Sequence, residues 1–188
     1  MNPAAPQSIL IVDDHPLFRK GVIQLIQAAP EFRFVGEAAS GKEGIALAHR
    51  LQPHMILLDL NMKDMNGVEV LKTLKDDGLD SRIIMLTVSD HAEDLMAALQ
   101  AGADGYLLKD MEPEDLMQQL GEAARGKITI SERLTQLLVA SLREKDRPTS
   151  LAEAGLTEQE SRILDHLIDG KSNKLIARDM NIAEGTVK

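Results

Sequence analysis

Five polar side chains follow directly on four short apolar runs of the sequence. Asp13 and Asp14 follow ILIV, Asp59 follows ILL, Thr87 ends IIMLT, and Lys109 follows YLL. Carboxylates, a hydroxyl and an ammonium are the groups that phosphoryl transfer needs, because that reaction depends on positioning and on neutralising charge. If the fold gathers these groups, they could hold a divalent cation and accept a phosphoryl group.

Each side chain would have its own part in that chemistry. Asp59 would be the nucleophile that becomes an aspartyl phosphate, and Asp13 and Asp14 would hold the metal directly or through water. Oxygen ligands in small number suit Mg²⁺ better than Zn²⁺, which prefers His and Cys. Lys109 would pair with one phosphoryl oxygen, and Thr87 would hydrogen-bond another only when the phosphate is present. The residues therefore predict a Mg²⁺-dependent phosphoacceptor site with Thr87 as a switch.

Taken singly, these residues have ordinary structural explanations. An Asp after a strand is commonly a helix cap or part of a turn, a Lys there is commonly solvated, and Thr has a high strand propensity. Their joint occurrence after four apolar runs is much harder to explain by chance. Clustered carboxylates would also oppose folding unless a bound cation balances them. The set as a whole favours the functional interpretation.

The apolar runs alternate with amphipathic stretches, which is typical of βα units around a parallel sheet. We predict strands at 8–12, 32–37, 55–58, 82–87 and 105–108, and helices at 16–28, 42–50, 68–75, 92–101 and 113–125. Helix-start signals are Ser40, Pro113 and the pair Asp90 and Glu93, and helices should end at Gly102 and Gly126. Functional groups of such a sheet collect at the carboxyl ends of its strands, so this fold would bring the polar residues together.

A second region follows the last of these helices. An amphipathic stretch at 131–143 predicts a further helix, and the charged REKDRPT at 143–149 is typical of a linker. Two short helical patterns begin at Thr157 and Ser172, and Gly170 separates them. Two short helices across a glycine-bearing connection are the outline of a helix-turn-helix.

The predicted parts of the chain are an α/β domain at 1–127, a linker helix and flexible linker at 128–150, and a partial helix-turn-helix domain at 151–188. A last helical pattern begins near Glu184 and has no stop signal before Lys188, so we expect this domain to be truncated. Acidic side chains outnumber basic ones in it, so charge alone does not predict DNA binding. The SNK segment could place a phosphate contact at Lys174, although a plain helix cap explains it as well.

Composition narrows the class of protein. The formal net charge of −9 at pH 7 opposes binding of the whole chain to nucleic acid or anionic membranes, so any DNA binding must be local. No Cys is present, which excludes disulfides and thiolate metal sites. The five His are scattered without ligand spacing and predict no metal site of their own. The sequence shows neither a signal peptide nor a membrane span, so we expect a cytoplasmic protein.

Several segments carry a specific resemblance: IVDDHPLFRKGV, ILLDLNM, GADGYLLKDMEPEDL, LTEQES and SNKLIARDMNIAEGTVK. On these segments the chain resembles two-component response regulators of the NarL/FixJ family, in which a receiver domain precedes a LuxR-type helix-turn-helix. Within the family it is most similar to the nitrate/nitrite response regulators. The resemblance implies a CheY-like, flavodoxin-like fold, with a doubly wound five-stranded parallel sheet of order 2-1-3-4-5, followed by a small all-α domain.

The resemblance also implies roles for the receiver residues. Asp59 would be phosphorylated by a sensor histidine kinase and, with Asp13, Asp14 and the backbone carbonyl of Asn61, would bind Mg²⁺. Thr87 and Lys109 would contact the phosphate, and Tyr106 would be the switch aromatic.

For the second domain, the resemblance implies phosphorylation-dependent binding to promoter DNA, with Lys188 as a DNA contact. Such binding would need residues beyond Lys188, and phosphorylation would favour a homodimer. The regulated genes would respond to nitrate or nitrite.

One loop departs from the family pattern. After the phosphoacceptor the family usually has NMPGMNG, and this chain has NMKDMNG, so Lys63 and Asp64 replace a rigid Pro-Gly pair. We expect a more mobile loop and added negative charge close to Asp59.

Two other functions compete with a phosphorylation-switched transcription regulator. A Mg²⁺-dependent phosphohydrolase of the haloacid-dehalogenase kind would use Asp59 as nucleophile and a second Asp two residues later as general acid, but that position is Asn61. Without a proton donor the acyl phosphate should persist, so we predict that the chain is not an enzyme. A receiver-only signalling protein, whose C-terminal part does not bind DNA, is the other alternative.

Overall fold

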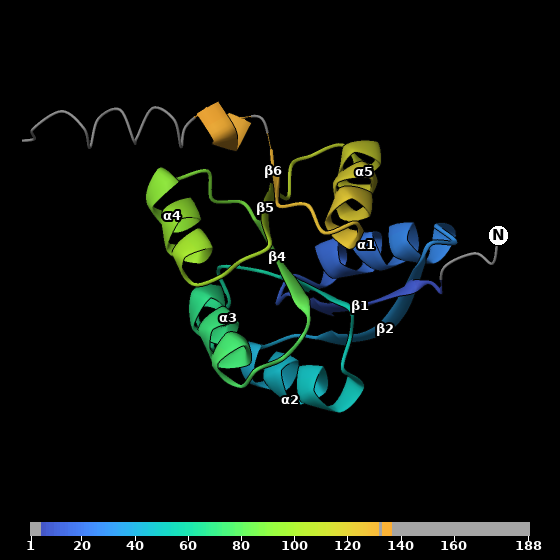
Figure 1. The fold of residues 1–188 in the computed structure, drawn as a ribbon, viewed down its shortest axis with the longest axis horizontal. Helices are drawn as coiled ribbons and strands as arrows, with labels where there is room; N and C mark the ends of the chain where they lie inside the picture. Colours follow the sequence, from blue (N-terminus) through green and yellow to red (C-terminus); the bar gives the residue numbers. More distant parts are fainter. Residues whose placement is uncertain (1–4, 132, 137–188) are drawn as a thin grey trace, which may run out of the picture. The chain divides into compact units, whose positions relative to one another are not determined.

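The computed structural model describes residues 5–131 and 133–136. Within these ranges the chain forms a sheet that is covered by helices on both faces (Figure 1). The predicted helix at 131–143 lies mostly outside the described residues, and the predicted helix-turn-helix, with Lys174 and Lys188, lies entirely outside them. The predicted domain boundaries at 127 and 150 stay predictions.

The sheet is parallel throughout. Its strands are β1 (Gln7–Val12), β2 (Phe32–Ala38), β3 (Met55–Leu58), β4 (Arg82–Thr87), β5 (Gly105–Leu108) and β6 (Thr129–Ile130). The strand order is β2-β1-β3-β4-β5-β6. The five predicted strands and the order 2-1-3-4-5 are confirmed, and β6 extends the sheet beyond them. The sequence does not predict β6, because a strand of two residues is too short to show an alternating pattern.

Helices cover the two faces of the sheet unequally. They are α1 (Pro16–Ala28), α2 (Gly41–Leu51), α3 (Gly67–Asp76), α4 (Ala92–Gln100) and α5 (Pro113–Ala124). In β1, Ile9 and Ile11 pack in a core layer with α1 and α5, whereas Leu10 and Val12 pack in a layer with α2, α3 and α4. Strands buried on both faces are necessarily continuous apolar runs, which is why the sequence locates them so well. No helix among the described residues combines the length and apolar character needed to cross a membrane.

Most of the predicted helix ends are confirmed. The Ser40 hydroxyl accepts a hydrogen bond from the Glu43 amide at 3.3 Å, and Pro113 is the first residue of α5. Gly102 and Gly126 follow α4 and α5 with φ values of 93° and 91°, where glycine is favoured.

The predicted capping box at the start of α4 is wrong. His91 precedes the helix, and within the described part of the chain no side chain caps it. The Asp90 carboxylate instead pairs with the guanidinium of Arg133. A contact from a segment 43 residues away thus replaces the local cap.

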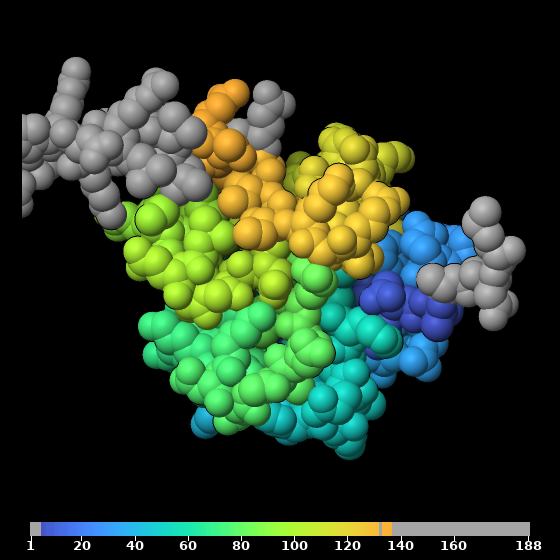
Figure 2. All heavy atoms as spheres, viewed as in Figure 1, coloured from blue at the N-terminus to red at the C-terminus, as the bar shows by residue number. Residues whose placement is uncertain are grey.

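The segment from β6 to residue 136 packs onto the sheet. Leu134 has no exposed surface and belongs to the core layer that contains Leu95 of α4 and Tyr106 of β5. The Arg133 guanidinium contacts Asp90 and lies 3.8 Å from Asp110. In Figure 2 this orange segment forms a continuous surface with α4 and α5. It therefore lies beside the two loops that follow β4 and β5.

Candidate functional site

Three predicted site residues meet at the carboxyl edge of the sheet. The Lys109 ammonium nitrogen lies 2.9 Å from Asp13 Oδ2 and 2.8 Å from Asp59 Oδ2. All three side chains are buried, with exposed fractions of 6% for Lys109 and 2% for each aspartate. The predicted convergence of strand-end side chains is therefore present, and a buried cation holds two carboxylates together.

The backbone explains why these side chains reach the same level. Each residue continues the ladder one step past its strand: the Asp13 amide donates to Ala38 O at 3.0 Å, and the Asp59 amide donates to Val12 O at 2.8 Å. In the same way the Lys109 amide donates to Thr87 O at 2.8 Å. Because parallel strands carry these residues in register, their side chains leave the sheet at one edge.

The surroundings of Asp59 disfavour its ionised form. Burial raises the pKa of the Asp59 carboxyl, and the negative charge of Asp13 adds to the rise. The Lys109 ammonium and the Asn61 amide, 3.4 Å from Asp59 Oδ1, act in the opposite direction. The balance leaves the pKa above its ordinary value, so these contacts do not fully compensate the ionised carboxylate for its burial.

The oxygen atoms of the cluster fit a divalent cation. Asp14 Oδ1 is buried and, among the described residues, accepts no hydrogen bond. Asp59 Oδ2 is buried as well and contacts the Lys109 ammonium. Asp13, Asp14, His15 and Asp59 each offer one ligand atom, and these atoms lie within 4.8 Å of one another. A hard cation such as Mg²⁺ would satisfy a buried carboxylate oxygen that accepts no hydrogen bond.

His15 is a member of the cluster that sequence reasoning missed. Its Nδ1 atom lies 3.0 Å from Asp14 Oδ1, 3.3 Å from Asp13 Oδ1 and 3.5 Å from Asp59 Oδ2. The side chain is 63% exposed, so it lies at the mouth of the site. The only signal in the sequence is its place directly after the two aspartates. An exposed imidazole that lies close to three carboxylates can balance part of their negative charge when it is protonated.

The loop after Asp59 brings Asn61 to the site. The backbone of Asn61 pairs with Asn66 in an isolated bridge, and the Gly67 amide donates to Leu60 O at 2.7 Å. A Cβ atom on Gly67 would lie 2.2 Å from the Asp59 carbonyl oxygen, so only glycine allows α3 to begin this close to Asp59. The loop is thus closed on itself beside the acidic cluster.

The two predicted switch residues share one partner, Ser89. The Thr87 hydroxyl oxygen accepts a hydrogen bond from the Ser89 amide at 3.1 Å, and the Tyr106 hydroxyl donates to the Ser89 carbonyl oxygen at 3.2 Å. The Ser89 hydroxyl in turn donates to Asp94 at 2.5 Å. Thr87 and Tyr106 are both fully buried. The sequence does not indicate Ser89, because no local pattern shows that its backbone is hydrogen-bonded to two buried side chains.

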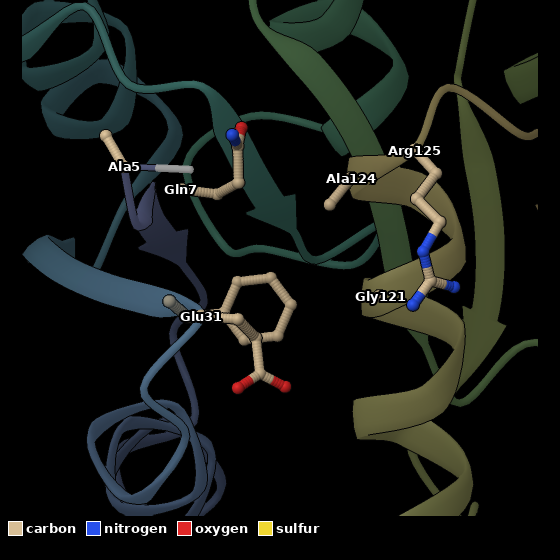
Figure 3. A pocket seen from close by; sticks show the side chains of 7 residues that line it. Ala5, Gln7, Glu31, Gly121, Ala124 and Arg125 are labelled. Atoms are coloured by element: carbon tan, nitrogen blue, oxygen red, sulfur yellow. The ribbon is translucent and has the colours of Figure 1, made fainter. Parts of the chain in front are cut away.

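Two of the hollows in the described part of the chain differ in their distance from the acidic cluster. One, of about 390 Å³, is lined by apolar side chains of α1 and α5 and reaches Lys109, whose ammonium is 4.9 Å from the centre of the Phe18 ring. The other, of about 360 Å³, lies near the start of β1 and the end of α5, where Figure 3 shows Glu31 and Arg125 on opposite walls. Its lining includes none of the predicted site residues.

Comparison with known families matches two parts of the chain. The family described as "Response regulator receiver domain" matches residues 9–121, and the family described as "Bacterial regulatory proteins, luxR family" matches residues 154–188. The Escherichia coli (strain K12) nitrate/nitrite response regulator protein NarL is 50% identical over 188 residues, which are 100% of this chain and 87% of that protein. The corresponding protein NarP of the same strain is 46% identical and is covered to 86%.

Solved structures agree with these relatives. A LuxR-family two-component response regulator from Aurantimonas sp. matches 73% of this chain and 99% of its own, with a TM-score of 0.70 and 28% identity. The receiver domain of a putative response regulator NarL from Mycobacterium tuberculosis matches 65% of this chain and 98% of its own, with a TM-score of 0.63 and 31% identity. A structure of two RcsB dimers bound to two parallel DNAs matches 97% of this chain and 86% of its own, with a TM-score of 0.67 and 26% identity.

Proposed function

Since the chain belongs to the response regulators in which a receiver domain precedes a luxR-type regulatory domain, we propose that a sensor histidine kinase phosphorylates it on Asp59. The observation that carries this proposal is the pair of contacts from the Lys109 ammonium to Asp13 and Asp59 at the carboxyl edge of the sheet. A buried ammonium beside a buried carboxylate suits the transfer of a group that brings negative charge.

Mg²⁺ is the cation that the cluster would hold. Asp13, Asp14, Asp59 and the backbone carbonyl of Asn61 would supply its protein ligands, because they are hard oxygen donors and the buried Asp14 Oδ1 accepts no hydrogen bond from the described residues. When bound, the ion would neutralise charge on the phosphoryl group.

The side chains of this chain then account for the transfer. An Asp59 carboxylate oxygen forms a bond to the phosphorus of a phosphohistidine, and the phosphorus–nitrogen bond breaks with its electron pair left on the histidine. The Lys109 ammonium, which now contacts two carboxylates, pairs with a phosphoryl oxygen. Burial of Asp59 keeps bulk water away from the product.

A switch follows from the partners of Thr87. Its hydroxyl now accepts from the Ser89 amide, and donating to a phosphoryl oxygen would draw it toward Asp59. Because Tyr106 is hydrogen-bonded to the same residue, the loop at 88–91 and the buried ring would respond together. Contacts that exist only in the phosphorylated state bias a two-state equilibrium toward that state.

Control of transcription is the output that the second family match supports. Residues 154–188 would begin a DNA-binding domain, with Lys174 and Lys188 as contacts and with further residues beyond Lys188 needed for full binding. The relatives' names support nitrate or nitrite as the signal, and the dimeric DNA complex of a similar regulator supports a homodimer on phosphorylation. We place the receiver at 1–127, the linker at 128–150 and the DNA-binding part at 151–188, in the cytoplasm, where kinase and DNA both occur.

The two alternatives carry less support. The relatives are transcriptional response regulators and not enzymes, which confirms the prediction that this chain is not an enzyme. A receiver-only function would leave the luxR-family match at 154–188 without a role.

One experiment tests phosphorylation and its output. The full chain is incubated with Mg²⁺ and a small-molecule phosphodonor, the acyl phosphate is reduced with borohydride, and the modified residue is located by mass spectrometry. We expect the label at Asp59, none in Asp59→Ala, and normal labelling in the control Asp110→Ala, whose carboxylate is 73% exposed. Label elsewhere would overturn the assignment. Equal DNA affinity of the phosphorylated and unphosphorylated chain in gel retardation would overturn the switch.

A further inference from the structure

The Asp64 carboxylate completes the cap of a helix that begins 23 residues earlier. Its Oδ1 atom accepts from the Gly41 amide at 3.0 Å and its Oδ2 atom accepts from the Lys42 amide at 3.2 Å. These are the first two amides of α2, which have no acceptor inside the helix. The third amide, of Glu43, is bound by Ser40. Asp64 and Ser40 together satisfy the free amides at the start of α2.

This contact fixes the loop that follows Asp59. The loop is closed at its base by the Gly67 amide and the Asn61–Asn66 bridge, and Asp64 ties its outer part to another helix. The sequence alone predicts that Lys63 and Asp64 make the loop more mobile and that Asp64 adds charge near Asp59. The structure instead directs the carboxylate onto amides of α2, which offset its charge.

The start of α2 also packs closely against the 61–66 loop and α3. A Cβ atom on Gly41 would lie 2.7 Å from Val70 Cγ2 and 3.1 Å from Met65 Cβ, so the start of α2 is pressed against the loop and α3. The helices α2 and α3 contact each other and lie side by side (Figure 1). Two backbone hydrogen bonds also hold the pKa of the exposed Asp64 carboxyl below its usual range. A fixed carboxylate three residues after Asn61 restricts where the Asn61 carbonyl can point.

We propose that Asp64 is a positioning residue for the phosphoacceptor site, which fixes the Asn61 carbonyl toward Mg²⁺ by docking the 61–66 loop on the first two amides of α2. The inference rests on the proposed function, because it assumes that Asn61 is a ligand. If undocking leaves the carbonyl in place for only part of the time, the apparent affinity for Mg²⁺ falls by that fraction. A plain helix cap would change the stability of the fold and leave that affinity unchanged.

Calorimetric titration of the unphosphorylated full chain with Mg²⁺ distinguishes a positioning role of Asp64 from that of a plain helix cap. We expect Asp64→Ala to weaken Mg²⁺ binding by about three- to tenfold, in the manner of outer residues that orient metal ligands. The matched control is Ser40→Ala, which removes the other cap of α2 and leaves the loop contact intact. We expect it to change the affinity by less than about twofold while both variants lose stability. Equal affinity losses in the two variants, or none in Asp64→Ala, would overturn the inference.

Asp64→Asn, read together with hydrogen exchange, separates docking from charge. Asn carries no charge and can accept from only one of the two amides, so we expect its Mg²⁺ affinity and the protection of its 61–66 amides to fall together, to values between those of the unaltered chain and Asp64→Ala. An Asn variant that keeps full protection of these amides but binds Mg²⁺ as weakly as Asp64→Ala would assign the effect to charge and overturn docking. If the unaltered chain binds no Mg²⁺ and is not labelled on Asp59, the proposed function fails and the inference with it. If the unaltered chain does both and Asp64→Ala equals it, only the inference fails.

Discussion

The Tyr106 hydroxyl donates a hydrogen bond to the backbone carbonyl oxygen of Ser89 at 3.2 Å, from a side chain with no exposed surface. Burial raises the pKa of Tyr106 to about 12. The negative charges of Asp94 and Asp90 add to the rise. The ionisation of Tyr106 is therefore sensitive to the position of Ser89, to which Thr87 is also hydrogen-bonded.

We expect alkaline titration to show this burial directly. The chain has one Tyr and no Trp, so the near-ultraviolet absorbance of phenolate comes from Tyr106 alone. In the folded protein the midpoint should lie near pH 12, and in urea near the ordinary 10.0. A raised pKa means that the stability contributed by the buried phenol is complete below pH 10 and is lost as the pH rises through about 12. A folded protein that titrates near 10 would contradict the buried position.

Asp59→Asn should stabilise the protein at neutral pH when Mg²⁺ is absent. Burial and Asp13 raise the pKa of Asp59, so its ionised form is less favourable in the folded state than in the unfolded chain. The contribution of Asp59 to stability is greatest below its ordinary pKa of 3.8 and falls as the pH rises through the folded pKa. Urea unfolding with EDTA at several pH values should therefore show a gain at pH 7 that shrinks toward pH 4.

The control for this measurement is Asp110→Asn, because that carboxylate is 73% exposed. We expect it to change the free energy of unfolding by less than about 0.5 kcal/mol at every pH. A gain in Asp59→Asn that did not depend on pH would exclude ionisation as its cause.

Lys109→Met should destabilise the Mg²⁺-free protein by about 3 kcal/mol at pH 7, because it leaves two buried carboxylates without their cation. Mg²⁺ can replace part of that charge, so the rise in melting temperature on adding Mg²⁺ should be larger in the variant than in the unaltered chain. Lys127→Met, which removes an exposed ion pair with Glu122, serves as the control and should change stability little. Identical Mg²⁺ effects in all three proteins would argue against a shared site.

The centre of the site is predictable from the sequence because its residues obey a local rule. Asp13, Asp59 and Lys109 each come directly after an apolar run, and such runs in a βα chain must be strands buried on both faces. Parallel strands end at one edge, so the order of the runs is enough to predict that these side chains meet.

Contacts between distant segments follow no such rule. The Asp64 carboxylate binds Gly41 and Lys42, and Arg133 takes Asp90 away from the helix it would otherwise cap. Nothing within a few residues of Asp64 or Asp90 indicates these partners, because they depend on how whole helices pack. Sequence patterns therefore predict the strands and the acidic cluster but not the contacts that hold the loops around it.

Leu134→Ala should destabilise the fold although Leu134 follows the last predicted strand by many residues. Its side chain has no exposed surface and packs in the core layer of Tyr106 and Leu95, so truncation leaves a cavity that costs about 2 to 4 kcal/mol. Urea unfolding of the full chain measures this loss. Leu17→Ala is the matched control, because Leu17 is 85% exposed and its truncation should cost less than about 0.5 kcal/mol. Equal midpoints for the two variants would show that the segment after β6 does not contribute to the core, and would remove Arg133 as a link to the loop before α4.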